Sequence, residues 1–247
     1  MAKEVFKRVE KKYLLDAESF EKVLSGIKDY MDMDPYNLNG EYYTLCSLYF
    51  DTDDKRFIRH SLSSPVYKEK LRLRSYGVPK EESKVYLEIK KKLKGTVYKR
   101  RSGFIYSDAM EFLEKREMPD IKEGMNPQVV KELCVFLNEN PDIKPSCMVA
   151  YDRLAFFSKE DKNLRISFDK DIRTRMYDLE LIKGDYGEAL IEPDMRLMEI
   201  KAAGGYPLWL VKILSENEIR RKKFSKYGKA YENYKKELLE EELGLTV

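Results

Sequence analysis

The stretch KEKLRLRSYG, residues 68–77, has a cation at every second position and an apolar residue between neighbouring cations. Lys70, Arg72 and Arg74 alternate here with two leucines. Because successive side chains of a β-strand point to opposite faces of the sheet, a strand with this sequence has one cationic face and one apolar face. Taken alone, the pattern is typical of a solvated sheet edge, where charge discourages aggregation.

The same alternation recurs in other segments with strand character. In VYLEIKKKLKG, Glu88, Lys90 and Lys92 are in phase, and Leu87 and Ile89 lie opposite them. The further in-phase sets are Arg8, Glu10 and Lys12; Lys99 and Arg101; Arg153; Arg165, Ser167 and Asp169; and Glu199 and Lys201. A pattern that nearly every strand repeats is not explained by one solvated edge.

Strands with one charged face can be arranged in two ways. If the apolar faces filled a small barrel, the charges would face solvent and the helices would have no apolar surface to pack on. If helices cover the apolar faces instead, the charged faces point into the barrel. Burying like charges costs several kcal/mol per ion unless each ion is paired or liganded. The second arrangement therefore requires an anionic ligand.

A ligand with several phosphates meets this requirement. Arginine binds phosphate oxygens through two parallel hydrogen bonds, and lysine adds a mobile charge. The fewer in-phase carboxylates suit Mg²⁺ or Mn²⁺, which take their remaining oxygens from phosphate and water. Phosphoryl transfer needs little from the protein beyond positioning and charge neutralisation. No GxxxxGK[ST] segment occurs, which excludes a Walker-type nucleotide site. The four in-phase carboxylates that could hold such an ion are Glu10, Glu88, Asp169 and Glu199.

The composition excludes several other classes of protein. The chain has 47 Lys and Arg against 44 Asp and Glu, so its net charge of +3 is too small for a generically basic nucleic-acid binder. His60 is the only histidine, expected in a polar surface loop, and the three cysteines form no C-x-x-C pair. No signal-peptide core and no apolar run near the roughly 18 residues that span a membrane occur. We therefore expect a cytoplasmic protein without a transmembrane segment.

The order of predicted elements indicates an α+β fold built on an antiparallel sheet. A strand around residues 5–14 precedes a helix capped by Asp16, and YTLCSLYFD begins a meander of strands. The pattern is helical over residues 107–145, returns to strands up to RLMEIKAAG, and ends in two helices. Residues 1–247 contain no repeat or linker, so we expect one domain, an antiparallel barrel with helices on its outside.

Several segments, taken in order, resemble a known family. They are VEKKYLL, SLYFDT, KLRLRSYG, VYLEIKKK with GTVYKRR, AYDRLAFF with LRISFD, MEIKA, and RKKFSKYGKAY. This series looks like the vacuolar transporter chaperone (VTC) domain, the polyphosphate polymerase branch of the triphosphate tunnel metalloenzymes. The resemblance covers about residues 5–231, nearly the whole chain.

The resemblance implies a barrel that forms a tunnel, with basic residues holding a triphosphate and glutamates holding Mn²⁺ or Mg²⁺. It also implies polyphosphate synthesis, in which the γ-phosphate of ATP passes to a growing chain and ADP is released. The catalytic side chains implied in this way are Arg72, Arg74, Lys90, Arg153, Arg165 and Lys201. Further substrate contacts would come from Lys12, Lys70, Lys99, Arg101, Lys223 and Lys226, the last two at the tunnel mouth. Glu199 would be the leading metal ligand, with Glu88 and Glu10.

One departure from the family pattern lies in the first strand. Where tunnel enzymes have E-x-E-x-K, this chain has Arg8, Glu10 and Lys12, so a cation replaces one carboxylate, as is common in the VTC branch. This difference disfavours hydrolase-type metal chemistry on that strand.

Other functions fit the same residues. A tunnel could instead hydrolyse tripolyphosphate or nucleoside triphosphates, or it could bind polyphosphate as a sensor without turnover. A further alternative is a charged face that is only solvated and binds no ligand. Tyrosines near the basic strands resemble a stacking platform for nucleic acid, but Glu88 and Glu199 would repel its backbone, so we expect no nucleic-acid partner. The expected partners are ATP, polyphosphate or triphosphate, with a membrane-associated protein as a further one. The basic segment Arg220 to Lys229 fits both a tunnel edge and a membrane-surface patch.

Overall fold

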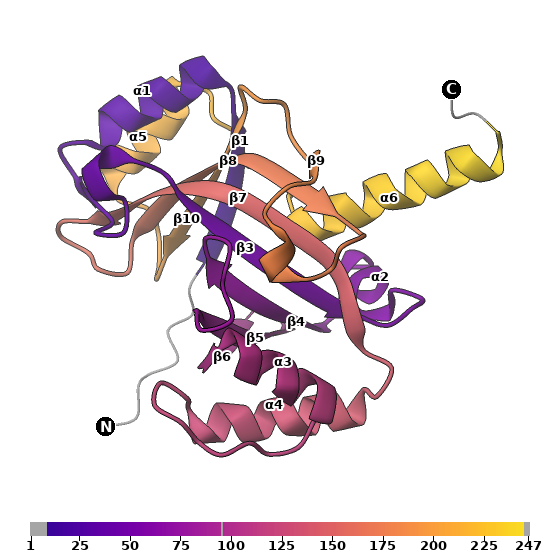
Figure 1. Ribbon diagram of the computed structural model, residues 1–247. Helices are drawn as coiled ribbons and strands as arrows, with labels where there is room; N and C mark the ends of the chain where they lie inside the picture. The colour runs from indigo at the N-terminus through magenta and orange to yellow at the C-terminus, as the bar shows by residue number, and fades with distance from the viewer. Residues whose placement is uncertain (1–8, 95, 245–247) are drawn as a thin grey trace. The chain divides into compact units, whose positions relative to one another are not determined.

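The computed structural model describes residues 9–94 and 96–244 (Figure 1). The chain forms two compact units, and strands β3 (Tyr43–Asp51), β7 (Lys144–Ser158) and β8 (Arg165–Arg175) contribute residues to both. The described part of the first unit is residues 9–44, 151–172 and 191–224, and that of the second is residues 45–94, 96–150, 173–190 and 225–244. A single domain over residues 1–247 stays a prediction.

In the first unit, strand β10 (Arg196–Ala202) pairs antiparallel with β1 (Val9–Leu15) on one side and with β8 on the other. The short strand β2 (Met31–Met33) pairs with β7 and is followed by the 3-10 turn η1 (Leu38–Gly40). Among the described residues, this unit contains two α-helices, α1 (Ala17–Ile27) and α5 (Leu208–Glu216), which lie side by side in Figure 1.

Helices α1 and α5 cover the apolar face of these strands. Ile166 on β8 and Ile200 on β10 are fully buried in one cluster with Val23 of α1 and Leu210 of α5. The predicted N-cap is confirmed, because Asp16 Oδ1 accepts a 2.8 Å hydrogen bond from the backbone N–H of Ser19. Because α1 and α5 cover the apolar face of these strands, the charged side chains occupy the opposite face.

The second unit is built on an antiparallel meander. Strand β3 pairs with β4 (Tyr67–Tyr76), β4 with β5 (Lys84–Leu93), and β5 with β6 (Thr96–Ile105). Helices α3 (Tyr106–Lys115) and α4 (Pro127–Glu139) lie next to these strands in Figure 1. The unit also contains α2 (Arg56–Leu62), α6 (Lys226–Glu242), the 3-10 turn η2 (Leu181–Lys183) and β9 (Glu188–Ala189), which pairs with β8.

The leucines of the opening stretch lie under helices. Leu71 and Leu73 are 1% and 0% exposed and belong to the apolar cluster that contains Phe112 of α3 and Leu133 of α4. Because side chains alternate along a strand, the cations of residues 68–77 occupy the opposite face of β4. This is the arrangement in which helices cover the apolar face of the sheet.

The strand order corrects one expectation. Hydrogen-bonded pairing runs β1-β10-β8-β7-β3-β4-β5-β6, with β2 and β9 off this path. No pairing between described residues joins β1 to β6, so the sheet is open where a closed barrel was predicted, whereas the α+β class is confirmed. Strand β6 is suited to an edge because Tyr98, Lys99 and Arg100 are exposed on it, and exposed charge discourages further pairing.

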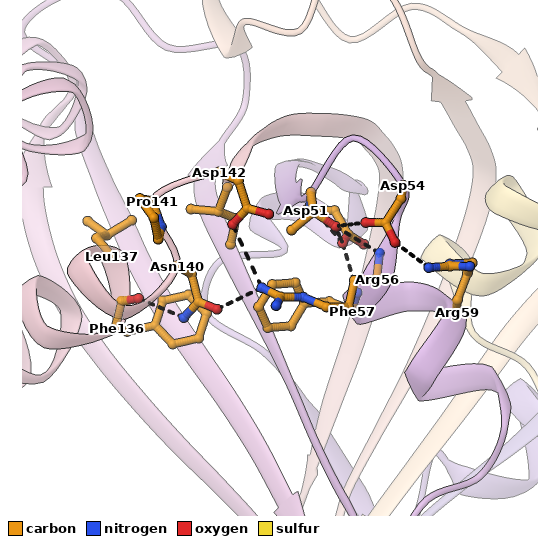
Figure 2. A network of polar contacts seen from close by, with 12 residues as sticks. Asp51, Asp54, Arg56, Phe57, Arg59, Phe136, Leu137, Asn140, Pro141 and Asp142 are labelled. Carbon is orange, nitrogen blue, oxygen red and sulfur yellow. Dashed lines mark hydrogen bonds and ion pairs between the residues drawn. The ribbon is translucent and has the colours of Figure 1, made fainter.

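The segment around His60 is also different from the expectation of a loop. It forms helix α2, and Asp51 caps this helix by accepting hydrogen bonds of 2.8 and 2.9 Å from the backbone N–H groups of Phe57 and Ile58. Figure 2 shows Asp51 facing the first turn of α2. The histidine is exposed, as expected, and its Nε2 lies 2.9 Å from the carbonyl oxygen of Tyr67. The described part of the chain contains no helix with the length and apolar character needed to cross a membrane.

Candidate functional site

The strand register of the second unit brings the predicted cations together. Across β3, β4, β5 and β6, one row runs Tyr49, Arg72, Glu88 and Arg101. The next row runs Lys70, Lys90 and Lys99 over β4, β5 and β6, and Arg74 lies on the other side of the first row, between Ser47 and Tyr86. We call the side chains of Lys70, Arg72, Arg74, Lys90, Lys99 and Arg101 the cationic face.

Glu88 lies at the centre of the cationic face and is 1% exposed. Arg72 Nε donates a 2.6 Å hydrogen bond to Glu88 Oε2, and Lys99 Nζ lies 2.7 Å from Oε1. Burial alone would raise the pKa of Glu88, but the charges of Arg72, Arg74 and Lys99 outweigh burial and hold this pKa well below its usual range. The carboxylate is therefore ionised, and it balances only part of the charge around it.

Two other cations of this face also contact neutral side chains. Arg74 is 9% exposed, and its Nε donates a 3.1 Å hydrogen bond to Ser47 Oγ. The guanidinium of Arg101 lies 3.4 Å from the centre of the Tyr86 ring, which is the distance of a stacked cation–π contact. Fixed cations of this kind are preorganised for an anion, because they need not be ordered when it binds.

The pKa of Lys99 reflects the excess of positive charge on the cationic face. The Lys99 side chain is 42% exposed, but its ammonium end lies against the buried Glu88, and burial of this end lowers its pKa. The charges of Arg72 and Arg74 lower the pKa further and Glu88 opposes them, so that the pKa of Lys99 is about 8. A lysine normally titrates near about 10.4. A bound polyanion would favour the charged ammonium and return this pKa toward its usual range.

The first unit carries a second charged face with more acid in it. Rows across β1, β10 and β8 run Lys12, Glu199 and Ser167, and then Glu10, Lys201 and Arg165. We call the side chains of Glu10, Lys12, Glu199 and Lys201 the mixed-charge face. Lys12 Nζ lies 3.2 Å from Glu199 Oε1 and 3.5 Å from Glu10 Oε1. Lys201 Nζ lies 3.9 Å from Glu199 Oε2 and 3.8 Å from Glu10 Oε2.

Arg153, predicted as a phosphate contact, is buried beside this face. Its Nε and its NH2 nitrogen donate hydrogen bonds of 2.6 and 2.8 Å to the two oxygens of Asp169, and NH2 lies 3.5 Å from Glu199 Oε2. Arg153 is 6% exposed and Asp169 is 0% exposed. Arg165, also predicted as a phosphate contact, is half-buried, with its NH2 nitrogen 3.1 Å from Asp34 Oδ2.

The predicted metal ligands fall in two places. Glu10 and Glu199 share Lys12 and Lys201 as neighbours on adjacent strands of the first unit, whereas Glu88 lies among the cations of the second. The described residues contain no group of three or more acidic, histidine or cysteine side chains that could hold a metal ion. Two carboxylates do fit Mg²⁺ or Mn²⁺, because these ions take their other oxygens from phosphate and water. Arg8, which replaces the first glutamate of the family pattern, lies outside the described residues.

The two lysines predicted at a tunnel mouth belong to different units. Lys223 is exposed in an irregular segment of the first unit. Lys226 is the first residue of α6 in the second unit and is 8% exposed. The N-cap of α6 is Ser225, whose hydroxyl accepts a 3.1 Å hydrogen bond from the backbone N–H of Gly228. The role of both lysines as substrate contacts stays a prediction.

The sequence analysis did not identify a network that begins at Asp51. Besides capping α2, Asp51 accepts a 2.8 Å hydrogen bond at Oδ2 from the hydroxyl of Tyr227 on α6. Figure 2 shows the outer part of this region, where Asp54 pairs with Arg59, and Arg56 donates a 2.9 Å hydrogen bond to Asn140. The segments that meet here are far apart in sequence, so no local pattern signals the contact.

The chain is similar to known proteins in sequence and in fold. A sequence model of the VTC domain matches residues 7–235. No curated protein matches the chain. The solved structure of a candidate adenylate cyclase from Bacillus halodurans has a TM-score of 0.51 and 14% identity, covering 89% of this chain and 95% of that chain. A candidate adenylyl cyclase from Hippeastrum with a dominant triphosphatase activity has a TM-score of 0.48 and 16% identity, covering 89% of this chain and 93% of that chain. The likeness to the Bacillus structure supports the fold.

Proposed function

This chain belongs to the VTC domain family, and we propose that it is a metal-dependent polyphosphate polymerase that transfers the γ-phosphate of ATP to a growing polyphosphate chain. The observation that carries the proposal is the cationic face, where six predicted cations surround one buried carboxylate. Glu88 and Arg74 on this face are only 1% and 9% exposed, so this is not the usual solvated side of a sheet.

The cationic face supports the proposal through its match to a chain of phosphates. Arg72 and Arg74 lie two residues apart on β4, and Lys90 and Lys99 face each other on the next two strands. Arginine can bind two oxygens of one phosphate, whereas lysine serves as a movable point charge. Together they would hold successive phosphates and stabilise the charge that develops during transfer. Further contacts on this face would come from Lys70 and Arg101. Substrate contacts by Lys12, Arg165 and Lys201 of the first unit stay predictions, as does a contact by Arg153, whose guanidinium is bound by Asp169.

The reaction needs no general base on the protein. A terminal phosphate oxygen of the polyphosphate chain is already ionised, and it attacks the γ-phosphorus of ATP. A new P–O bond forms, the bond between the γ-phosphorus and its bridging oxygen breaks, and ADP leaves with that oxygen. The protein aligns the two phosphates and neutralises their charge, which is the main requirement of phosphoryl transfer.

Glu199 and Glu10 are the residues we assign to Mg²⁺ or Mn²⁺. Glu199 is 7% exposed and is held by Lys12 and Arg153, so its carboxylate is fixed in place. A bound divalent ion would supply neutralising charge to phosphate oxygens. Lys12 and Lys201 hold the two carboxylates together when this ion is not bound.

Incubation of the purified protein with ATP and Mn²⁺ tests the proposal. We expect ADP to be released together with polyphosphate chains that resolve as a ladder on a gel. ADP with an equal amount of orthophosphate and no ladder would instead identify a triphosphate hydrolase. Retained tripolyphosphate binding without turnover at any Mn²⁺ or Mg²⁺ concentration would identify a sensor. Glu199→Gln should abolish turnover in the first two cases and leave tripolyphosphate binding nearly intact in the third.

A further inference from the structure

We propose that Tyr49 is a further phosphate-contacting residue of the cationic face, and that Tyr227 of α6 positions its ring. The inference rests on the proposed function, because it assumes that this face binds phosphates. Both tyrosines lie in segments that resemble the family.

Tyr49 occupies the end of the central row of the site. It lies directly opposite Arg72 in the register of β3 and β4, and Arg72 lies opposite Glu88 on β5. The Tyr49 side chain is half-buried, unlike its strand neighbours Leu48 and Phe50, which are 0% and 4% exposed on the other face. The tyrosine therefore shares its face with the cations and not with the apolar core.

The hydroxyl of Tyr49 has a proton to give to a ligand. Its oxygen accepts a 3.3 Å hydrogen bond from the NH1 nitrogen of Arg72. Among the residues that the structure describes, none accepts a hydrogen bond from this hydroxyl. A phenol that accepts from an arginine and donates to a phosphate oxygen would link the two, and hydrogen bonds to ionised acceptors are the stronger kind.

The charge around Tyr49 favours such a contact. Burial would raise the pKa of Tyr49, but the charges of Arg72, Arg74 and Lys70 outweigh burial and lower the pKa to about 8. A phenol made more acidic in this way is a better hydrogen-bond donor while it stays protonated. A bound phosphate would accept a hydrogen bond from the phenol and would be attracted by the three cations.

Tyr227 fixes the Tyr49 ring from one side. The two rings are stacked, with centroids 4.8 Å apart and an interplanar angle of 20°. Tyr227 is 2% exposed, and its hydroxyl donates a 2.8 Å hydrogen bond to Asp51 Oδ2 and lies 3.0 Å from Ser146 Oγ. Asp51 is itself held by backbone N–H groups of α2, so the Tyr227 ring has little freedom to turn.

The polar chain behind Tyr227 has one consistent direction. Lys55 Nζ donates a 3.0 Å hydrogen bond to Ser146 Oγ, and the serine hydroxyl can then donate to Tyr227, which donates to Asp51. Linked hydrogen bonds of this kind strengthen one another in a buried setting. The first turn of α6 thereby anchors a residue of the cationic face.

The test of Tyr49 is binding of sodium tripolyphosphate, measured by isothermal titration calorimetry at pH 7 on the purified chain. Tyr49→Phe keeps the ring and removes only the hydroxyl, so we expect an affinity about tenfold weaker than that of the wild type. Tyr67→Phe is the matched control. Tyr67 is exposed and its hydroxyl donates to Glu69 on β4, so we expect the wild-type affinity.

The outcomes separate this inference from the proposed function. If the wild type does not bind tripolyphosphate, the proposed function fails and the inference fails with it. If the wild type binds and Tyr49→Phe binds within twofold of it, the assignment of Tyr49 is wrong while the function stands. A tenfold loss in Tyr49→Phe with no loss in Tyr67→Phe supports the assignment.

A double-mutant cycle tests the positioning role of Tyr227. If Tyr227 acts through Tyr49, Tyr227→Phe weakens tripolyphosphate binding several-fold in the wild type and has no further effect in the Tyr49→Phe background. An equal loss in both backgrounds would show a general structural effect and overturn the positioning role. Ser146→Ala, which removes only one partner of the Tyr227 hydroxyl, gives the same cycle if Tyr227→Phe does not fold.

Discussion

Arg72 Nε and Glu88 Oε2 are joined by a 2.6 Å hydrogen bond between neighbouring strands, and the carboxylate in this pair is 1% exposed. Breaking a buried ion pair by removing one partner is costly, since the other charge stays buried. We therefore predict that Glu88→Gln lowers the free energy of unfolding by about 3–5 kcal/mol, measured by urea denaturation. Tripolyphosphate should raise the melting temperature of this variant more than that of the wild type.

The control for this prediction is Glu132→Gln, which breaks the ion pair with Arg100 on the helix-covered side of the meander. This pair is more exposed, so its loss should cost far less stability.

The effect of Glu88 also has a defined pH dependence. Because the folded-state pKa of Glu88 is depressed, its stabilisation is present above about pH 5 and is lost as the pH falls. A difference between wild type and Glu88→Gln that stays constant down to pH 2 would contradict this.

Arg100 and Arg101 provide a matched pair for testing which face binds the anion. Arg101 lies opposite Glu88 on the cationic face, whereas the guanidinium of Arg100 donates hydrogen bonds of 2.7 and 2.8 Å to Glu132 of α4. We predict that Arg101→Gln weakens tripolyphosphate binding about tenfold and that Arg100→Gln leaves it unchanged. Equal losses in the two variants, measured by calorimetry, would mean that only net charge matters.

Lys99 should make anion binding sensitive to pH. In the free protein its pKa is about 8, set by burial and by Arg72 and Arg74 against the opposing charge of Glu88. A bound phosphate prefers the charged lysine, so affinity for tripolyphosphate should fall as the pH rises through 8. Ionisation of Tyr49, whose pKa is also about 8, acts in the same direction.

The measurement is the ratio of wild-type to Lys99→Gln affinity between about pH 7 and pH 9.5, since ionisation of the ligand is common to both proteins and cancels. We expect this ratio to decline as the pH rises. A ratio that is constant over the range would show that Lys99 does not contact the anion, and the pH dependence would then have to come from other groups.

Arg153 and Asp169 should contribute mainly to the stability of the first unit. They are joined by two hydrogen bonds of 2.6 and 2.8 Å and are almost fully buried. Asp169→Asn leaves the guanidinium without its full counter-charge, so we predict a loss of about 3–5 kcal/mol in the free energy of unfolding. Glu18→Gln, which breaks an exposed pair with Lys22 on α1, is the control and should change little. Equal stability of the two variants would contradict the prediction.

Much of the fold could be predicted from alternation and capping. The apolar phase of Leu71 and Leu73 placed one strand face under helices, and Asp16 marked the start of α1. Helix α2 could not be predicted in the same way, because its seven residues are capped by Asp51 from the preceding strand. Closure of the sheet is also not a local property, since it depends on which strands pair at the two ends.

The candidate site shows the same limit. The phase of residues 68–77 and 84–93 predicted which side chains share a face, but the register that sets Arg72 opposite Glu88 comes from the strand pairing. The contact of Tyr227 with Asp51 joins residues 176 positions apart, and only tertiary packing creates it. The sequence therefore indicated the chemistry of the site and not the anchor that supports it.

The most direct test of the account is a crystal structure of the protein with bound tripolyphosphate. The account predicts phosphate oxygens within about 3 Å of the guanidinium nitrogens of Arg72 and Arg74, on the face of the meander opposite Leu71 and Leu73. Phosphates bound only elsewhere, such as beside Arg100 on the helix-covered side, would contradict it.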